Sequence, residues 1–293
     1  MKRVSHEIWG GLSVFVSAFC FYLSTASIRW SRGDVELDSS FFVFFRFLLG
    51  FFMILGVMLI KRKPFRPKRY DLLFWRTVSN VVAVYCFFKA VTLTTVAEAN
   101  ILNMTYPLFI ALFSWLFLKQ RHEPMVYGMV LLSFVGIIMI LNPDQLNWNP
   151  NNLWGLASGV IAAISIIFLN MARQHDDTET ILLMMFGLGS LISMLYAWPV
   201  IHQPTLLELK YLLACGIMGV AGQYFLTLGL KVISATESGI ISSTRILLAA
   251  FLGPWIAADH PLSITGWVGA FLIFAANCYL TWKKVDSPTL RTH

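Results

Sequence analysis

The chain has 293 residues, of which 57% are hydrophobic and only 13% are charged. A soluble domain carries about 25% charged residues, so this composition excludes an ordinary soluble protein and indicates a membrane protein. The net charge of +7 does not call for nucleic acid as a partner, because the cations fall in short segments between apolar runs, as they do beside an anionic leaflet.

The apolar residues form long runs of the length that spans a hydrocarbon core of roughly 30 Å. We expect ten transmembrane helices. They lie approximately at 8–28, 40–60, 72–92, 97–118, 126–141, 153–171, 180–200, 209–229, 236–257 and 263–282. Most lysines and arginines between these runs fall on the side that holds both termini, so the positive-inside rule places the termini in the cytoplasm. The predicted fold class is an all-α polytopic protein of the cytoplasmic (inner) membrane.

The first apolar run follows Lys2 and Arg3, as a secretory signal does, but it is longer than the roughly 7–15 apolar residues of a signal peptide. We therefore keep it as a transmembrane helix. Small residues recur along one of its faces from Ser13 to Ser27. They predict a close helix crossing first and the wall of a polar cavity second.

The second and third runs each carry an arginine near one end. Arg46 lies about one and a half turns into its helix, and Arg76 lies just inside the next, with Asn80 one turn further on the same face. Both arginines are close enough to a headgroup region to snorkel there. The alternative is that they face the bundle interior and bind substrate.

The fourth run opens on Glu98, which the positive end of the helix dipole stabilises; a proton-coupling role is the alternative. Asn103 and Tyr106 share one face of this helix and are candidates for substrate binding. Pro107 frees a backbone carbonyl and predicts a kink.

The ninth run carries Arg245 near its middle, with no acid beside it in the sequence. An arginine there costs about 2.5–3.5 kcal/mol on insertion scales, so it faces a cavity or a partner rather than lipid. Its planar fork suits a carboxylate or a phosphate, which makes Arg245 the leading substrate-binding candidate. Ser242 shares its face, with close packing as the alternative role. Glu237 opens this run as Glu98 opens the fourth, and the same two roles apply.

The two halves of the chain resemble each other. Trp9-Gly10 aligns with Trp154-Gly155, and Val96-Ala97-Glu98 aligns with Ala235-Thr236-Glu237. We therefore expect a first repeat at 1–145, a second at 146–285 and a short cytoplasmic tail at 286–293. Five helices in each repeat is an odd number, so the second repeat enters the membrane from the opposite side. Such inverted-topology repeats are typical of secondary transporters that work by alternating access.

Several motifs resemble the EamA-type, ten-helix branch of the drug/metabolite transporter superfamily. They are Phe45-Arg46-Phe47, the stretch from Thr94 to Asn100, Tyr106-Pro107-Leu108-Phe109, and the run from Ala111 to Lys119. Where the family usually has Leu-Gly-Glu, this chain has Leu118-Lys119-Gln120 and, in the second half, Ala258-Asp259. The resemblance implies a metabolite transporter. Arg46, Trp75-Arg76 and Arg245 most resemble the subgroup that takes up S-adenosylmethionine.

Three function classes stay open. The inverted repeat and the buried arginines favour a secondary transporter of a small anionic or zwitterionic metabolite, such as an amino acid, S-adenosylmethionine or a related compound. A non-transporting scaffold subunit or a channel is the second class. An integral membrane enzyme is the third, but it needs clustered bases, nucleophiles or metal ligands, and every histidine and aspartate falls outside the apolar runs.

The remaining expectations concern partners. The four cysteines form no CxxC pair, so they predict neither a disulfide framework nor zinc. We expect no catalytic residue, no metal or other cofactor and no nucleic-acid partner. The partners are a small-molecule metabolite and the lipid bilayer. A homodimer stays open through Gly155-x3-Gly159, although this pair also suits packing within the chain.

Overall fold

The structure, a computed structural model, describes residues 2–118, 124–141, 149–229 and 235–283. This described part folds into eleven α-helices and one short 3-10 helix and contains no strand. The helices are α1 (Lys2–Asp34), α2 (Ser39–Ile60), α3 (Tyr70–Leu93), α4 (Val96–Asn103), α5 (Tyr106–Leu118), α6 (Pro124–Leu141), α7 (Asn152–Ala172), α8 (Thr178–Ala197), η1 (Trp198–Val200), α9 (Leu206–Gly229), α10 (Ala235–Ile256) and α11 (Ile264–Lys283).

The helices agree with the predicted apolar runs. Seven segments of the described chain are long and apolar enough to cross a membrane. The shorter apolar helices Tyr127–Ile140, Ile241–Ile256 and Ile264–Tyr279 bring the set to ten. The prediction of an all-α polytopic membrane protein is confirmed. Helix α1 continues past the predicted end of its run at residue 28 to Asp34, where the Tyr211 hydroxyl donates a hydrogen bond to the Asp34 carboxylate.

The fourth predicted helix is divided into two helices in the structure. The run at 97–118 breaks between α4 and α5, at Met104 and Thr105. Pro107 is the second residue of α5; it has no N–H to donate, and its ring clashes with the carbonyl of Asn103 if the helix continues. The Met104 N–H turns back to the Asn100 carbonyl at 3.0 Å and the Thr105 N–H to the Leu102 carbonyl at 3.2 Å. The break therefore lies about 12 Å along the helix from the start of α4.

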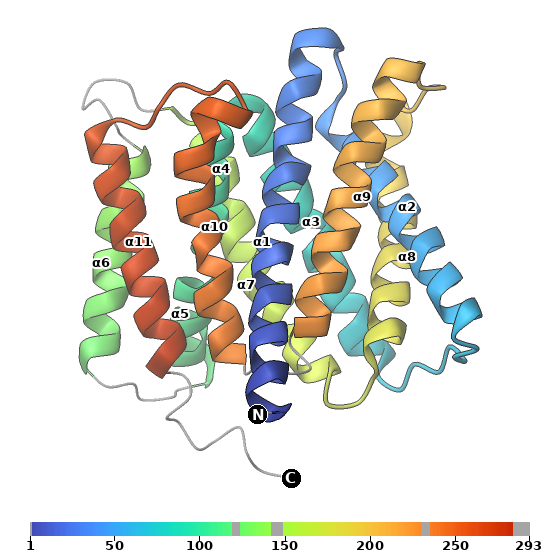
Figure 1. Cartoon of the computed structure of the whole chain (residues 1–293), viewed down its shortest axis with the longest axis horizontal. Helices are drawn as coiled ribbons and strands as arrows, with labels where there is room; N and C mark the ends of the chain where they lie inside the picture. The colour runs from blue at the N-terminus through green and yellow to red at the C-terminus, as the bar shows by residue number, and fades with distance from the viewer. Residues whose placement is uncertain (1, 119–123, 142–148, 230–234, 284–293) are drawn as a thin grey trace.

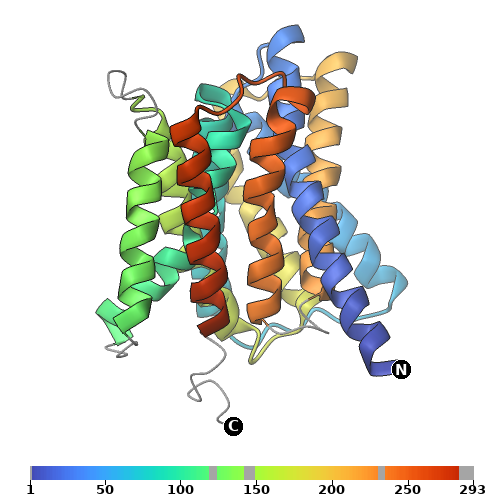
Figure 2. The same ribbon diagram turned by 60° about the vertical axis from the view of Figure 1, so that its left-hand side comes forward.

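The two halves interlock as one bundle (Figures 1 and 2). Helix α1 packs against α9 and α10, while α3 packs against α7 and α8. These contacts follow the repeat, in which α7 is equivalent to α1, α3 to α9 and α4 to α10. The contact of α1 with α9 therefore corresponds to that of α7 with α3, and the contact of α1 with α10 corresponds to that of α7 with α4. Helix α6 lies beside α11 in both views. The start of α1 and the end of α11 lie at the same end of the bundle (Figure 1). We call this the terminal end, and the opposite end the far end.

The contact between α2 and α8 shows the repeat at side-chain level. Phe47 and Phe186 meet edge to face, with ring centroids 5.9 Å apart. A Cβ at Gly50 would lie 2.4 Å from the Phe186 ring, and a Cβ at Gly189 would lie 2.5 Å from the Phe47 ring. The same number of residues separates Phe47 from Phe186 as separates Gly50 from Gly189, so each phenylalanine covers the glycine of the other repeat.

The glycine pair of α7 also packs inside the chain. A Cβ at Gly155 would lie 3.0 Å from Leu102, and a Cβ at Gly159 would lie 2.5 Å from the Thr105 hydroxyl. Helix α7 thus approaches the turn between α4 and α5 closely. The glycine pair that suggested a possible homodimer therefore packs within the chain, because glycine lets the two backbones come close together.

Candidate functional site

A cavity of about 150 Å³ lies between the two halves of the bundle. Helices α1 to α5 line it from the first half, and α7, α9 and α10 line it from the second. All six residues predicted to bind substrate line this one cavity. They are Arg46, Arg76, Asn103, Tyr106, Ser242 and Arg245. Asn80, predicted to share the face of Arg76, lines it as well.

Arg245 reaches into the cavity from α10 and is only 6% exposed. Its Nη2 donates to Oδ1 of Asn103 at 2.5 Å, and Nδ2 of Asn103 donates to the Ser158 hydroxyl at 2.9 Å. Its guanidinium carbon lies 5.5 Å from the Phe87 ring centroid and 5.7 Å from that of Phe21. Its Nε has no hydrogen-bond partner among the described residues. The break after α4 therefore presents Asn103 to the arginine and leaves part of the guanidinium available.

Arg46 approaches the same aromatic ring from α2. Its guanidinium carbon lies 5.7 Å from the Phe21 ring centroid and 5.5 Å from that of Phe88. Its Nη2 donates one long hydrogen bond of 3.5 Å to the Gly219 carbonyl on α9. A Cβ at Gly219 would lie 2.7 Å from the Arg46 Nε, so the side chain fits only because this residue is glycine.

Arg76 enters from α3 and is 4% exposed. Its Nη1 donates to the Ser165 hydroxyl on α7, and its Nη2 lies 3.8 Å from the sulfur of Met185. Its Nε has no hydrogen-bond partner in the part of the chain that the structure describes. Arg46 is likewise only 8% exposed. Neither arginine snorkels to a membrane surface; both turn inward.

The lining carries three arginines, and no aspartate or glutamate is among its described residues. Burying a charge without a partner costs free energy, and no acid among the described lining residues offsets that cost here. The first residue of α5, Tyr106, also lines the cavity, so the positive end of that helix dipole adds to the field. The arrangement is suited to hold an anion.

Sequence reasoning missed three contributors to this site. Phe21 lies under two of the arginines, Gly219 makes room for one of them, and Gln223 lines the cavity from α9. Only Gln223 left a signal, as an amide inside an apolar run. The Ser165 hydroxyl, on α7, also lines the cavity and accepts a hydrogen bond from Arg76.

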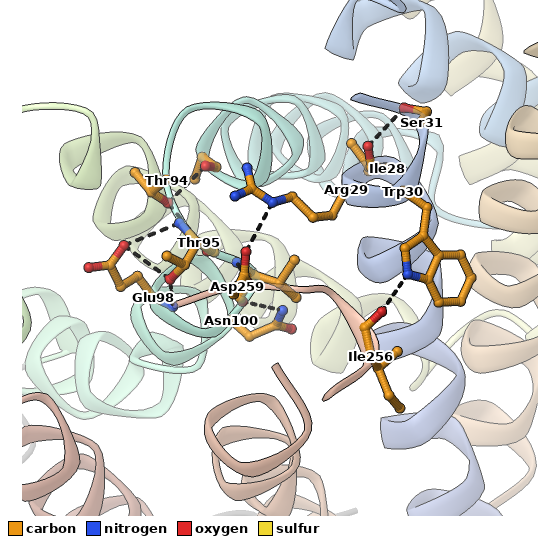
Figure 3. Close-up of polar contacts among 12 residues, drawn as sticks. Ile28, Arg29, Trp30, Ser31, Thr94, Thr95, Glu98, Asn100, Ile256 and Asp259 are labelled. Atoms are coloured by element: carbon orange, nitrogen blue, oxygen red, sulfur yellow. Dashed lines mark hydrogen bonds and ion pairs between the residues drawn. The ribbon is translucent and has the colours of Figure 1, made fainter. Parts of the chain in front are cut away.

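The two acids predicted for coupling lie elsewhere. Glu98 forms a capping box at the start of α4: its N–H donates to the Thr95 hydroxyl at 3.1 Å, and its carboxylate accepts from the Thr95 N–H at 3.2 Å (Figure 3). This is the helix-stabilising role weighed above, and Glu98 does not line the cavity. Glu237 lies in the first turn of α10, and its side chain lies outside the described residues.

A polar cluster ties three elements together at the far end (Figure 3). The Asp259 carboxylate, in the loop after α10, accepts from the Val96 N–H at 2.7 Å and pairs with Nε of Arg29 at 2.9 Å. The Trp30 indole donates to the Ile256 carbonyl at 2.5 Å. The Asp259 side chain is 1% exposed, and this burial raises the pKa of its carboxyl group. The preceding Ala258 has a φ of 51°, in the left-handed region that favours the glycine usual in the resembled motif.

A second cluster joins α2 to α8 at the terminal end. Lys61 and Lys63 pair with the two carboxylate oxygens of Glu179 at 3.2 and 2.8 Å. Asp176 accepts from the backbone N–H groups of Lys68 and Arg69 at 2.6 and 3.3 Å. The cavity therefore lies between two separate polar clusters, one at each end of the bundle.

Comparison with known proteins gives a consistent family. The EamA-like transporter family matches this chain twice, over residues 8–142 and 150–282. The pseudopaline exporter of Pseudomonas aeruginosa is 28% identical over 280 residues, which cover 94% of this chain and 97% of the exporter. The S-adenosylmethionine uptake transporter of Rickettsia prowazekii is 23% identical over 94% of this chain and 96% of its own. A solved crystal structure with 18% identity shares the fold, with a TM-score of 0.60 over 95% of this chain and 99% of that one.

Proposed function

Since the chain belongs to the EamA-like transporter family and is a multi-pass protein of the cell membrane, we propose that it is a secondary transporter that carries a small anionic or zwitterionic metabolite by alternating access. One observation carries the proposal. Arg46, Arg76 and Arg245 are buried around a single cavity, and no acid is among the described residues of its lining.

The arginines would act on the acid group of the substrate. An arginine presents a planar fork that binds a carboxylate or phosphate through two parallel hydrogen bonds. Asn103 holds the Arg245 Nη2 while the Arg245 Nε has no acceptor in the described chain, so the guanidinium is oriented before the substrate binds. The anion would offset the cost of the buried charge, which gives the site affinity for acids and little for cations.

Alternating access would use the two polar clusters as gates. The Asp259–Arg29 pair joins α1 to the loop after α10 at the far end, and the lysine–Glu179 pairs join α2 to α8 at the terminal end. Opening one cluster while the other stays closed would expose the cavity to one side at a time. Following the positive-inside rule, we place the terminal end in the cytoplasm.

Family membership alone sets no direction, because the similar proteins include an exporter and an uptake transporter. The proposal therefore covers either direction. Proton coupling through Glu98 and Glu237 and the repeat bounds at 1–145 and 146–285 stay predictions.

Counterflow in proteoliposomes tests the transport proposal. Vesicles are loaded with an unlabelled compound and then given the same compound labelled outside, across a panel of amino acids, small di- and tricarboxylates and S-adenosylmethionine. A carrier accelerates the exchange of at least one compound, Arg245→Ala abolishes it, and Arg69→Ala, an exposed arginine paired with Asp71, does not. Absence of acceleration for the whole panel with folded parent protein would favour a non-transporting scaffold instead.

A further inference from the structure

The three cavity arginines lie at different levels of the bundle. Arg46 lies about 10 Å along α2 from the start of that helix, which is its end nearer the far end of the bundle. Arg76 lies about 9 Å along α3 from the start of that helix, which is its end nearer the terminal end. Arg245 lies about 15 Å along α10 from the terminal end, between the other two. Arg46 and Arg245 both contact the Phe21 ring, each with its guanidinium carbon 5.7 Å from the ring centroid. Arg76 has a separate set of contacts, with Ser165 and Met185. The positive charge is therefore distributed along the cavity.

Each guanidinium also keeps donors available. An arginine has five N–H donors. Within the described chain, Nε of Arg76 and Nε of Arg245 have no acceptor, although both side chains are more than nine-tenths buried. Arg46 makes one hydrogen bond at the 3.5 Å limit. Each of the three arginines is thus a buried cation with hydrogen-bonding capacity that the described chain does not use.

A single acid group would not compensate the charges of all three arginines. One carboxylate accepts a bidentate pair from one arginine fork, which leaves the charge at the other end of the cavity uncompensated. The ammonium of a zwitterion would add a further positive charge, and the described lining offers no carboxylate to receive it. Charge balance therefore favours a molecule with a net negative charge and more than one acid group.

The size of the cavity limits that molecule. A cavity of about 150 Å³ is comparable to an engineered protein cavity that holds one benzene molecule. In this conformation the site fits a compact molecule of a few carbon atoms rather than one the size of a nucleoside.

Resting on the proposed transport function, we propose that the substrate is a compact polyacid with a net negative charge. It carries at least two acid groups, carboxylate or phosphate. Arg46 and Arg245 hold one acid group on the Phe21 side of the cavity, and Arg76 holds the other beside Ser165.

Ligand-induced stabilisation of the purified full-length protein tests this proposal. Melting is followed in detergent at constant ionic strength with succinate, with succinamate, which replaces one acid by an amide, and with 3-phosphoglycerate, which supplies a phosphate and a carboxylate. We expect succinate to bind at least about 10-fold more tightly than succinamate, since a hydrogen-bonded charge pair of 1.5–3 kcal/mol corresponds to about 10- to 100-fold. The 3-phosphoglycerate arm shows whether one of the two acids is a phosphate.

Variants assign the preference to the arginines. Arg76→Gln is expected to lower the affinity for succinate to that for succinamate. Arg69→Gln, at an exposed position, is expected to keep the preference for succinate. Arg76→Lys keeps the charge but loses the fork, so it is expected to retain part of the preference and to report on binding if the glutamine variant does not fold.

Equal binding of succinate and succinamate, no binding of any polyacid, or a preference that survives Arg76→Gln would overturn the proposal. The transport proposal fails in a different way, through polyacid binding without any counterflow. Counterflow of a neutral zwitterion in preference to polyacids would keep the transporter and discard the polyacid.

Discussion

At the scale of single residues, Gly219 decides where the Arg46 charge lies. Replacing Gly219 with alanine would place a Cβ 2.7 Å from the Arg46 Nε, so the guanidinium has to move although its charge is retained. We expect Gly219→Ala to lower the apparent substrate affinity in counterflow by about 10-fold, equivalent to about 1.4 kcal/mol. Gly56→Ala is the matched control, because nothing lies within 4 Å of a Cβ there. Equal affinities for the two variants would contradict this role of Gly219.

Asp259 gives the protein a pH dependence with a defined sign. Burial raises the pKa of its carboxyl group, while the Val96 N–H and Arg29 oppose the rise and Glu98 adds to it. Tyr22 also faces this acid. A raised folded-state pKa means that the folded protein binds the proton more tightly than the unfolded chain does, so this group favours folding most at low pH and loses that contribution as pH rises through its folded pKa.

We therefore expect the melting temperature of the parent, relative to that of Asp259→Asn, to increase as pH falls from 7 toward the ordinary aspartate pKa. The asparagine has no proton to bind, so it supplies the baseline. Parallel melting curves at every pH, or a parent that loses stability relative to the variant on acidification, would show that the Asp259 carboxyl does not titrate as its burial implies.

The candidate site could be predicted from sequence to the extent that it consists of costly residues. An arginine in the middle of a membrane helix is costly enough that it must face something polar, and this placed Arg245 among the candidates. Arg46 and Arg76 lie nearer to helix ends, where snorkelling was the other interpretation, and the family resemblance supported them. Phe21 and Gly219 gave no such signal among 24 phenylalanines and 19 glycines. Their roles arise from helices that meet in space, which the order of residues along one helix does not determine.

At the scale of helices, the break between α4 and α5 presents Asn103 and Tyr106 to the cavity. Pro107→Ala restores an N–H that can donate to the Asn103 carbonyl, which favours one continuous helix through the turn. We expect this variant to fold and to lower the counterflow rate by about 10-fold, or about 1.4 kcal/mol. Pro254→Ala is the control, since α10 already runs through Pro254 as a helix. Unchanged counterflow in Pro107→Ala would show that the break has no role in transport.

The helices themselves were predictable because the bilayer fixes their length and apolar character. Each predicted run corresponds to helix in the described part of the chain, except at the break between α4 and α5. The break in the fourth run was signalled only as a kink at Pro107. Where the chain resumes its helix depends on the close approach of Gly155 and Gly159 of α7 to that turn, a contact between segments far apart in sequence.

At the scale of the whole molecule, the two repeats interlock around the arginine cavity, and a polar cluster lies at each end of the bundle. The contacts of α1 with α9 and of α7 with α3 correspond under the repeat, so exchanging the conformations of the two halves would move the opening from one end to the other. We propose that the arginine cavity opens in turn to the two sides of the membrane and holds the acidic substrate.

Accessibility of Ser242→Cys tests that claim most directly. Ser242 lines the cavity beside Arg245, and the native cysteines Cys20, Cys86, Cys215 and Cys278 are first replaced so that the new thiol alone reacts. In proteoliposomes, a membrane-impermeant maleimide should label this cysteine when applied from either side, and succinate should slow the labelling. Labelling from one side only, or labelling from both sides that succinate leaves unchanged, would contradict the account.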